Sequence, residues 1–282
     1  MLKQRVLTAS VLAPLVIAGI FFLPFHIFVI AISSVTLLGH WEWTKLIDVS
    51  SRFNGITTPA FILIGSLYVL PVNYSGWNIT TMNGSIIALS GTVWWLFATV
   101  MVLKYPKDTC WWSDSTFFQQ IFSVLTLLPF LWSVLLLRAS DYHVHPYLGA
   151  KLVLLVCLLV WSADIGAYFT GKHFGKRKIA PSVSPNKTVE GLVGGLIASV
   201  LVTTVTATTI SIPFSSIYIL CIIALITSFA SVLGDLTESM FKRVAGVKDS
   251  GSILPGHGGI LDRIDSLTAA FPIFTVLYFW LA

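Results

Sequence analysis

The sequence predicts an all-α polytopic membrane protein with about nine transmembrane helices. Of its 282 residues, 56% are hydrophobic and only 10% are charged, whereas ordinary soluble domains carry about 25% charged residues. The mean hydropathy is +0.87. So few charges cannot cover a water-exposed surface, and this excludes a soluble globular protein. The spacing of the apolar runs points to the same class.

Nine apolar runs have the length of a membrane span, which is about 20 residues. The first run follows Lys3 and Arg5, as in a signal peptide, but it is too long and has no clear small-residue cleavage site. We therefore expect a retained helix there. The third run is short and ends at Pro71. The predicted spans are 6–24, 27–44, 57–72, 85–103, 117–137, 149–170, 188–209, 216–240 and 266–282.

The basic residues predict the orientation of these spans, because Lys and Arg concentrate in cytoplasmic loops. With a cytoplasmic N-terminus, only Arg138 and Lys151 of the seventeen basic residues flank the outer side. The C-terminus then lies outside. The fifteen basic residues on the inner side are Lys3, Arg5, Lys45, Arg52, Lys104, Lys107, Lys172, Lys176, Arg177, Lys178, Lys187, Lys242, Arg243, Lys248 and Arg263.

The charges divide the chain into two regions. Residues 164–265 hold nine of the seventeen basic and seven of the twelve acidic residues. We therefore expect an N-terminal transmembrane region, 1–147, with five of the predicted spans, and a C-terminal catalytic region, 148–282, with four. The catalytic region carries cytoplasmic loops at 171–187 and 241–265. In the N-terminal region, Trp41-Glu42-Trp43 lies at an inner membrane edge, where tryptophan usually anchors a helix to the interface.

The richest polar segment runs from Gly234 to Asp265. Asp235, Glu238, Ser239 and Lys242 are spaced so that they share one helical face. The preceding residues are apolar, so the two acids enter at the membrane interface, where unpaired charge is expensive. The simpler alternative is a helix that ends in water with a solvated face.

Glycines and carboxylates follow in the same segment. The run from Pro255 to Gly259 permits positive φ and close backbone approach, as a loop around phosphates requires. Asp262 and Asp265 stand three residues apart at a helix start, which suits a hard cation such as Mg²⁺ that shares oxygen ligands with phosphates. Helix capping would explain one aspartate without any metal.

A second polar cluster precedes this segment. Asp164 lies within the sixth span, and a charged residue inside a span is a functional candidate. Lys187-Thr188 stands at a helix start, where backbone N–H groups favour an anion. For the run Lys176-Arg177-Lys178 we favour the positive-inside rule over a role in the site. Together the two clusters indicate a cytoplasmic site at which a soluble phosphate-bearing substrate meets a lipid.

The same residues carry a family resemblance. The segments Ser239 to Arg243, Lys248 to Gly251 and Leu254 to Asp265 resemble the signature of phosphatidate cytidylyltransferases (CDP-diacylglycerol synthases), without a departure over 27 positions. Ser162 to Asp164 with Ala167-Tyr168, and Ser184 to Thr188 with Glu190-Gly191, also resemble that family. The similarity in length and hydropathy extends over the whole chain, including the Trp41-Glu42-Trp43 start, and is greatest to its bacterial branch.

The resemblance implies transfer of CMP from CTP to phosphatidate, which yields CDP-diacylglycerol and pyrophosphate. It implies a Mg²⁺ site at Asp235 and Asp262, with K⁺ as a candidate second cation, and a homodimer in a bacterial cytoplasmic (inner) membrane with the site facing the cytoplasm. No nucleic-acid partner is expected.

Residue chemistry and the resemblance together give two groups of candidate site residues. In the catalytic group the basic side chains would bind phosphate oxygens, and His257 would orient a phosphate or the loop, while a role as general base depends on geometry. The catalytic candidates are Asp235, Lys242, Arg243, Lys248, Asp249, His257, Asp262, Arg263 and Asp265. The substrate-binding candidates are Asp164, Lys172, Ser184, Asn186, Lys187, Thr188, Glu190, Glu238, Ser239, Gly258 and Gly259.

Two other functions stay open. A secondary transporter would explain many spans and a buried acid, but transporters place their sites near the membrane midplane between repeated halves, and here the charges gather at one face. A CTP-dependent polyprenol kinase would transfer the γ-phosphoryl group and release CDP instead of pyrophosphate.

Overall fold

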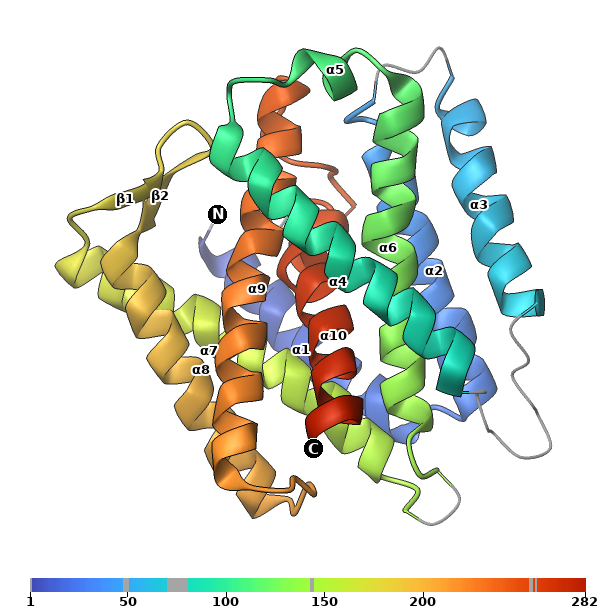
Figure 1. Ribbon diagram of the computed structural model, residues 1–282, viewed down its shortest axis with the longest axis vertical. Helices are drawn as coiled ribbons and strands as arrows, with labels where there is room; N and C mark the ends of the chain where they lie inside the picture. Colours follow the sequence, from blue (N-terminus) through green and yellow to red (C-terminus); the bar gives the residue numbers. More distant parts are fainter. Residues whose placement is uncertain (1, 48–50, 70–80, 143–144, 254–255, 257) are drawn as a thin grey trace.

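A computed structural model describes residues 2–47, 51–69, 81–142, 145–253, 256 and 258–282 of the chain. The described chain is almost entirely helical (Figure 1). Its helices are α1 (Leu2–Phe22), α2 (Phe25–Trp43), α3 (Arg52–Val69), α4 (Thr81–Lys104), α5 (Cys110–Ser113), α6 (Thr116–Ala139), α7 (Leu148–Phe174), α8 (Val189–Thr209), α9 (Ile217–Val244) and α10 (Leu261–Leu281). Two short strands, β1 (Lys178–Ala180) and β2 (Ser184–Thr188), complete it.

Seven of the described helices are long and apolar enough to cross a membrane: α2, α4, α6, α7, α8, α9 and α10. In α1 the apolar part, Ser10–Phe22, is shorter. The long helices coincide with the predicted runs, and the largest differences are at α3 and α10, which begin five residues earlier than predicted. A helix can continue beyond its apolar run when its polar side chains find partners inside the protein, as those at the start of α10 do.

The outer surface of α8 shows that these helices face an apolar environment. Val193, Ile197, Leu201 and Val205 recur every four residues on one face and are 50–62% exposed. A stripe of exposed large apolar side chains is unfavourable in water and suits contact with lipid tails. The protein is therefore an integral membrane protein.

Helices α7 and α8 pack side by side because small residues let their backbones approach. A Cβ atom added at Gly195 would lie 2.6 Å from the carbonyl oxygen of Ala163, and one added at Gly166 would lie 2.6 Å from the Cβ of Ala198. Larger residues at either glycine would force the pair apart. This pair forms one wall of the largest cavity described below.

The core lies where α6 and α7 meet the remaining helices. Leu131, Trp132, Leu135, Leu155 and Leu159 are fully buried, at 0% exposure. Helix α10 packs against α9, α4 and α6, so helices of the two predicted regions are in contact across the predicted boundary at residue 148 (Figure 1). The division into two regions stays a prediction.

The predicted loop 171–187 is largely ordered. It begins with the last turn of α7 and continues as an antiparallel hairpin in which Lys178 pairs with Thr188 and Ala180 with Ser184. No alternating apolar pattern in residues 178–188 predicts these strands. The predicted loop 241–265 is also shorter than expected, because α9 continues to Val244 and α10 begins at Leu261.

Candidate active site

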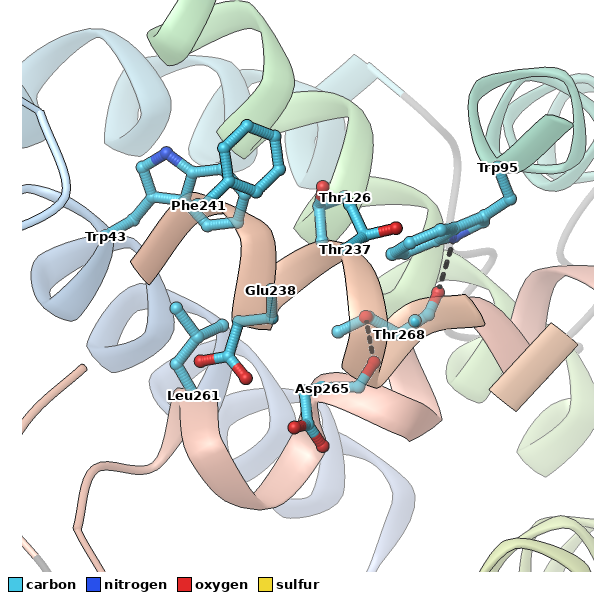
Figure 2. A pocket seen from close by; sticks show the side chains of 10 residues that line it. Trp43, Trp95, Thr126, Thr237, Glu238, Phe241, Leu261, Asp265 and Thr268 are labelled. Atoms are coloured by element: carbon cyan, nitrogen blue, oxygen red, sulfur yellow. Dashed lines mark hydrogen bonds between the residues drawn. The ribbon is translucent and has the colours of Figure 1, made fainter. Parts of the chain in front are cut away.

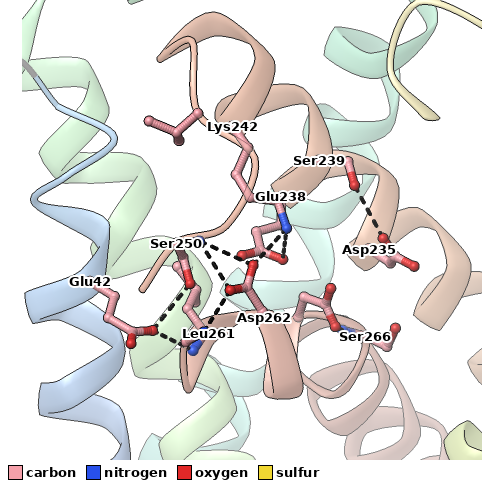
Figure 3. A network of polar contacts seen from close by, with 12 residues as sticks. Glu42, Asp235, Glu238, Ser239, Lys242, Ser250, Leu261, Asp262 and Ser266 are labelled. Atoms are coloured by element: carbon pink, nitrogen blue, oxygen red, sulfur yellow. Dashed lines mark hydrogen bonds and ion pairs between the residues drawn. The ribbon is translucent and has the colours of Figure 1, made fainter. Parts of the chain in front are cut away.

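The end of α9 and the start of α10 bring a lysine and two acids together in the interior. The Lys242 ammonium donates to Glu238 Oε2 at 3.2 Å and to Asp262 Oδ1 at 2.8 Å (Figure 3). The three side chains are 10%, 4% and 7% exposed, respectively. The alternative of a solvated helix face is therefore wrong for this part of α9. Buried charges of this kind persist only when they are paired and hydrogen-bonded.

Asp262 closes the loop that precedes α10. Its carboxylate accepts the backbone N–H of Ser250 at 3.0 and 3.2 Å and that of Gly259 at 2.8 Å. Gly258 has a φ of +84°, and a Cβ there would lie 2.7 Å from Asp262 Oδ2. Glycine is therefore required at this position, as the sequence predicted for a tight loop. Asp262 is not the N-cap residue of α10, which is Ile260. It lies in the first turn of the helix and accepts hydrogen bonds from the loop that precedes it.

Asp265 and Glu238 border a small cavity of about 10 Å³ (Figure 2). This is about the volume that one water molecule requires. Asp265 Oδ1 accepts the backbone N–H of Ser266 at 2.6 Å, and Glu238 Oε1 is buried without a hydrogen-bond partner among the described residues. Aromatic side chains form much of the wall. The lining residues are Trp43, Trp95, Thr126, Gly234, Thr237, Glu238, Phe241, Leu261, Asp265 and Thr268.

A larger cavity of about 330 Å³ lies between α7, α8, α9 and the hairpin. This volume falls in the range of small-molecule sites, about 300–1,000 Å³. In it Lys187 Nζ pairs with Asp235 Oδ2 at 2.6 Å, and these side chains are 24% and 29% exposed. Ser239 donates to Asp235 Oδ1 at 3.2 Å. The lining residues are Asp164, Ala167, Tyr168, Ile179, Asn186, Lys187, Thr188, Gly191, Leu192, Val232 and Asp235.

The charged groups of the two cavities lie near enough to influence one another, so the cavities form one polar site. The carboxylate of Asp164 interacts with those of Asp235 and Asp265, and with the cationic groups of Lys187 and Arg263. Asp265 in turn interacts with Asp235 and Lys242. The structure therefore brings together acids that are up to 101 positions apart in the sequence. Such a group repels added negative charge unless cations accompany it.

Other predicted site residues lie around this centre. Arg243 is exposed and its Nε donates to the carbonyl oxygen of Val183 at 3.2 Å, which ties α9 to the hairpin. Lys248, Asp249 and Arg263 are exposed. Lys172 is exposed, with its ammonium 5.8 Å from the centre of the Tyr168 ring. His257 lies outside the described residues.

The residues around the start of α8 support the backbone. Thr188 caps α8, and its Oγ1 accepts the N–H of Gly191 at 3.1 Å. Glu190 accepts the backbone N–H groups of Lys176 at 2.9 Å and Arg177 at 3.1 Å. Glu190 therefore holds the turn before the hairpin, and a contact with substrate stays a prediction. Ser184 lies at the start of β2.

The donors of the site suit a hard cation, because they are carboxylate oxygens. Within the described ranges, no group of three or more His, Cys, Asp or Glu residues is placed to hold a metal ion. Mg²⁺ commonly uses one or two carboxylates and completes its shell with water and substrate phosphates. Asp235, which lines the larger cavity, fits this pattern directly. Asp262 would first have to exchange at least one of its present partners, and the metal ligands stay a prediction.

Glu42 was missed as a site residue. It is 1% exposed and contacts the loop before α10. The interfacial reading of its neighbour Trp43 is wrong, because Trp43 is 2% exposed and packs against Phe241 with ring centres 5.1 Å apart. The sequence feature that could have indicated Glu42 is an acidic residue at the end of a predicted span. Its two tryptophan neighbours instead suggested an anchor at the membrane interface.

The chain is similar over nearly its whole length to a known protein family and to several bacterial proteins. The model of the cytidylyltransferase family matches residues 3–281. The chain is 43% identical to the phosphatidate cytidylyltransferase of Haemophilus influenzae, with 99% of each chain covered, and 42% identical to that of Pseudomonas aeruginosa, with 98% and 97% covered. It is 39% identical to that of Bacillus subtilis, with 100% and 98% covered. The chain therefore belongs to the cytidylyltransferase family.

Proposed function

We propose that this integral membrane protein transfers CMP from CTP to phosphatidate and releases pyrophosphate, which makes CDP-diacylglycerol for phospholipid synthesis. The observation that carries the proposal is the similarity over nearly the whole chain to three bacterial proteins with that name, at 39–43% identity. The complete signature from Ser239 to Asp265 agrees with it.

In this reaction a phosphate oxygen of phosphatidate attacks the α-phosphorus of CTP. The bond from that phosphorus to the oxygen bridging the α- and β-phosphates breaks, and pyrophosphate leaves with the electron pair. Phosphatidate is already anionic near neutral pH, so no strong general base is required. Such transfers depend mainly on positioning and on stabilisation of charge.

The larger cavity is the candidate binding place for phosphates. A triphosphate competes with Asp235 for the ammonium of Lys187, and this competition frees the Asp235 carboxylate. Asp235 and Asp262 would hold Mg²⁺, which when bound supplies neutralisation and alignment of the phosphates, and K⁺ is a candidate second cation. Arg243, Lys248 and Arg263, which are exposed beside the cavity and the loop, would bind phosphate oxygens of CTP and of the lipid.

The finer topology belongs to the proposal as well. We place nine spans in a bacterial cytoplasmic membrane, with the N-terminus and the active site on the cytoplasmic side and the protein as a homodimer. The orientation is supported by the basic residues, since this topology puts fifteen of seventeen on one side, and the bacterial membrane is supported by the bacterial relatives. Labelling of single cysteines introduced near Lys45 and near Arg138, in intact cells, would test the orientation.

The decisive experiment follows the fate of two radiolabels. Purified protein in mixed micelles with phosphatidate and Mg²⁺ should transfer label from [α-³²P]CTP to the lipid and release pyrophosphate. A lipid kinase would instead transfer label from [γ-³²P]CTP and release CDP. Uptake of a solute into liposomes without turnover of CTP would favour a transporter and contradict the proposal.

A further inference from the structure

Glu42, at the end of α2, reaches the loop that carries the family signature. Its Oε2 accepts the Oγ–H of Ser250 at 3.1 Å and the backbone N–H of Leu261 at 2.8 Å (Figure 3). These contacts join positions that are 208 and 219 residues apart in the sequence. No basic side chain pairs with Glu42 in the described part of the chain.

The loop closes tightly on this carboxylate. A Cβ atom added at Gly251 would clash with Glu42 Oε1, and one added at Gly259 would clash with Glu42 Oε2. Both glycines are buried. The signature therefore has glycine at two positions where the glutamate leaves no room for a side chain.

Two carboxylates hold the same neck of the loop from different elements. The neck consists of residues 250–251 and 259–261. Glu42 bonds the Ser250 hydroxyl and the Leu261 amide, whereas Asp262 bonds the amides of Ser250 and Gly259. The position of Asp262 relative to Lys242 thus depends on a neck that α2 fixes.

The end of α2 is itself well supported. Trp43 packs against Phe241 of α9. Arg52 lies over the Trp41 ring at 4.1 Å, and its Nη2 donates to the Trp41 carbonyl oxygen at 2.7 Å. A buried carboxylate without a cation destabilises a protein unless its hydrogen bonds compensate. Glu42 Oε1 has no partner among the described residues, so a purely structural purpose would be served better by an apolar side chain.

We infer that Glu42 is a positioning residue for the proposed reaction: it clamps the neck of the signature loop and thereby sets the Asp262 carboxylate. The inference rests on the proposed function. Glu42 does not line the larger cavity, so its loss affects the transfer step more than the binding of CTP. Displacement of a catalytic group by about 1 Å can lower a rate by about 100-fold.

The test compares Glu42→Leu and Glu42→Gln with Thr36→Val as a matched control. Thr36 is a buried polar residue of the same helix, and among the described residues its hydroxyl bonds within α2, to the Ile32 carbonyl oxygen. The glutamine amide oxygen can still accept from Ser250 and Leu261, whereas leucine cannot. We expect Glu42→Leu to lower kcat by about 10- to 100-fold. The KM for CTP should change by less than about threefold, which corresponds to less than about 0.7 kcal/mol of binding free energy. The kcat of Glu42→Gln should stay within about fivefold of that of the unchanged protein, which is about 1 kcal/mol in activation free energy. The kcat of Thr36→Val should equal that of the unchanged protein.

A second readout is independent of activity. Amide hydrogen exchange of the protein without CTP or metal should accelerate over residues 248–262 in Glu42→Leu and stay unchanged over the hairpin, residues 178–188. If the unchanged protein does not turn over CTP, the proposed function fails, and the exchange still decides whether the clamp exists. Unchanged exchange over 248–262, or unchanged kcat, in Glu42→Leu would overturn the inference.

Glu42→Leu could fail to fold, and Ser250→Ala then decides, because it removes one of the two bonds to Glu42 and keeps the backbone amide for Asp262. We expect faster exchange over 248–262 and a smaller fall in kcat than for the leucine variant. If Ser250→Ala matches the unchanged protein in both measurements, Glu42 serves folding alone and the inference is wrong.

Discussion

The site contains two lysine–aspartate pairs with similar geometry and opposite surroundings. Lys242 and Asp262 are 2.8 Å apart and 10% and 7% exposed, and their partners fill the space around them. Lys187 and Asp235 are 2.6 Å apart, 24% and 29% exposed, and line a cavity of about 330 Å³. The enclosed pair is held in place by its partners, and Asp262 would have to exchange one of them to bind a metal ion, whereas a ligand can reach the open pair directly. Changes at the two pairs should therefore differ in kind.

The largest effect is expected when the enclosed pair loses its lysine. Lys242→Met leaves the carboxylates of Glu238 and Asp262 buried without their cation, which should lower the free energy of unfolding by about 3–5 kcal/mol. Activity should be lost as well. Denaturation of the protein in mixed micelles measures the stability, and Lys107→Met, which removes an exposed lysine, is the control. If the free energy of unfolding of Lys242→Met equals that of the control, the Lys242–Asp262 pair does not stabilise the fold.

The next effect is expected at the open pair. Asp235→Asn should lower the CTP-dependent rate by about 100-fold, because a partner that stabilises transferring phosphates contributes about 3 kcal/mol. Stability should change by less than about 1 kcal/mol, because the pair is partly exposed. A Mg²⁺ titration of initial rates checks this, with Asp108→Asn as an exposed control. A near-normal rate across the titration would remove Asp235 from the metal site.

The lysine of the open pair should change binding more than chemistry. Lys187→Met should raise the KM for CTP by about tenfold, since a hydrogen bond to a charged group is worth about 1.5–3 kcal/mol. The melting temperature should stay close to that of the unchanged protein. Initial rates at varied CTP concentration measure the effect, and the exposed Lys176→Met is the matched control. A lower kcat with an unchanged KM would contradict the role in binding.

The smallest effect is expected at Glu190. Its Oε2 accepts two backbone amides before the hairpin, and the neutral amide oxygen of glutamine can still accept both, but more weakly than a charged carboxylate. Glu190→Gln should speed amide exchange at residues 176–177 and lower activity by less than about threefold. A large rise in the KM for CTP would instead place Glu190 in contact with substrate.

Most of the architecture follows from apolar run length. The seven helices that meet the length and hydropathy criteria for a membrane span all lie at predicted runs, because a helix is the simplest way to satisfy backbone polar groups in a bilayer. The ends of the helices were less predictable. Helix α10 begins at Leu261 because Asp262 and Asp265 find partners inside the protein, and a hydropathy pattern cannot detect such partners.

The candidate site was predictable as a list of residues and not as an arrangement. The signature and the excess of charge in residues 164–265 pointed to the acids and bases that the structure brings together. They did not indicate that Lys242 holds Asp262 and Lys187 holds Asp235. Ion pairs form between whichever charges the helix packing brings within reach, and that packing depends on contacts between distant segments.

By itself, the sequence determined that this protein is a helical membrane protein of the cytidylyltransferase family with its polar chemistry in residues 164–265. Composition and run length decide the first point, because a bilayer admits few solutions, and an unbroken signature decides the second. Only the tertiary structure decided which charges are enclosed and which line a cavity. It also decided that Glu42, from the apolar N-terminal part, holds the signature loop, since burial and hydrogen bonding are properties of the packed helices together.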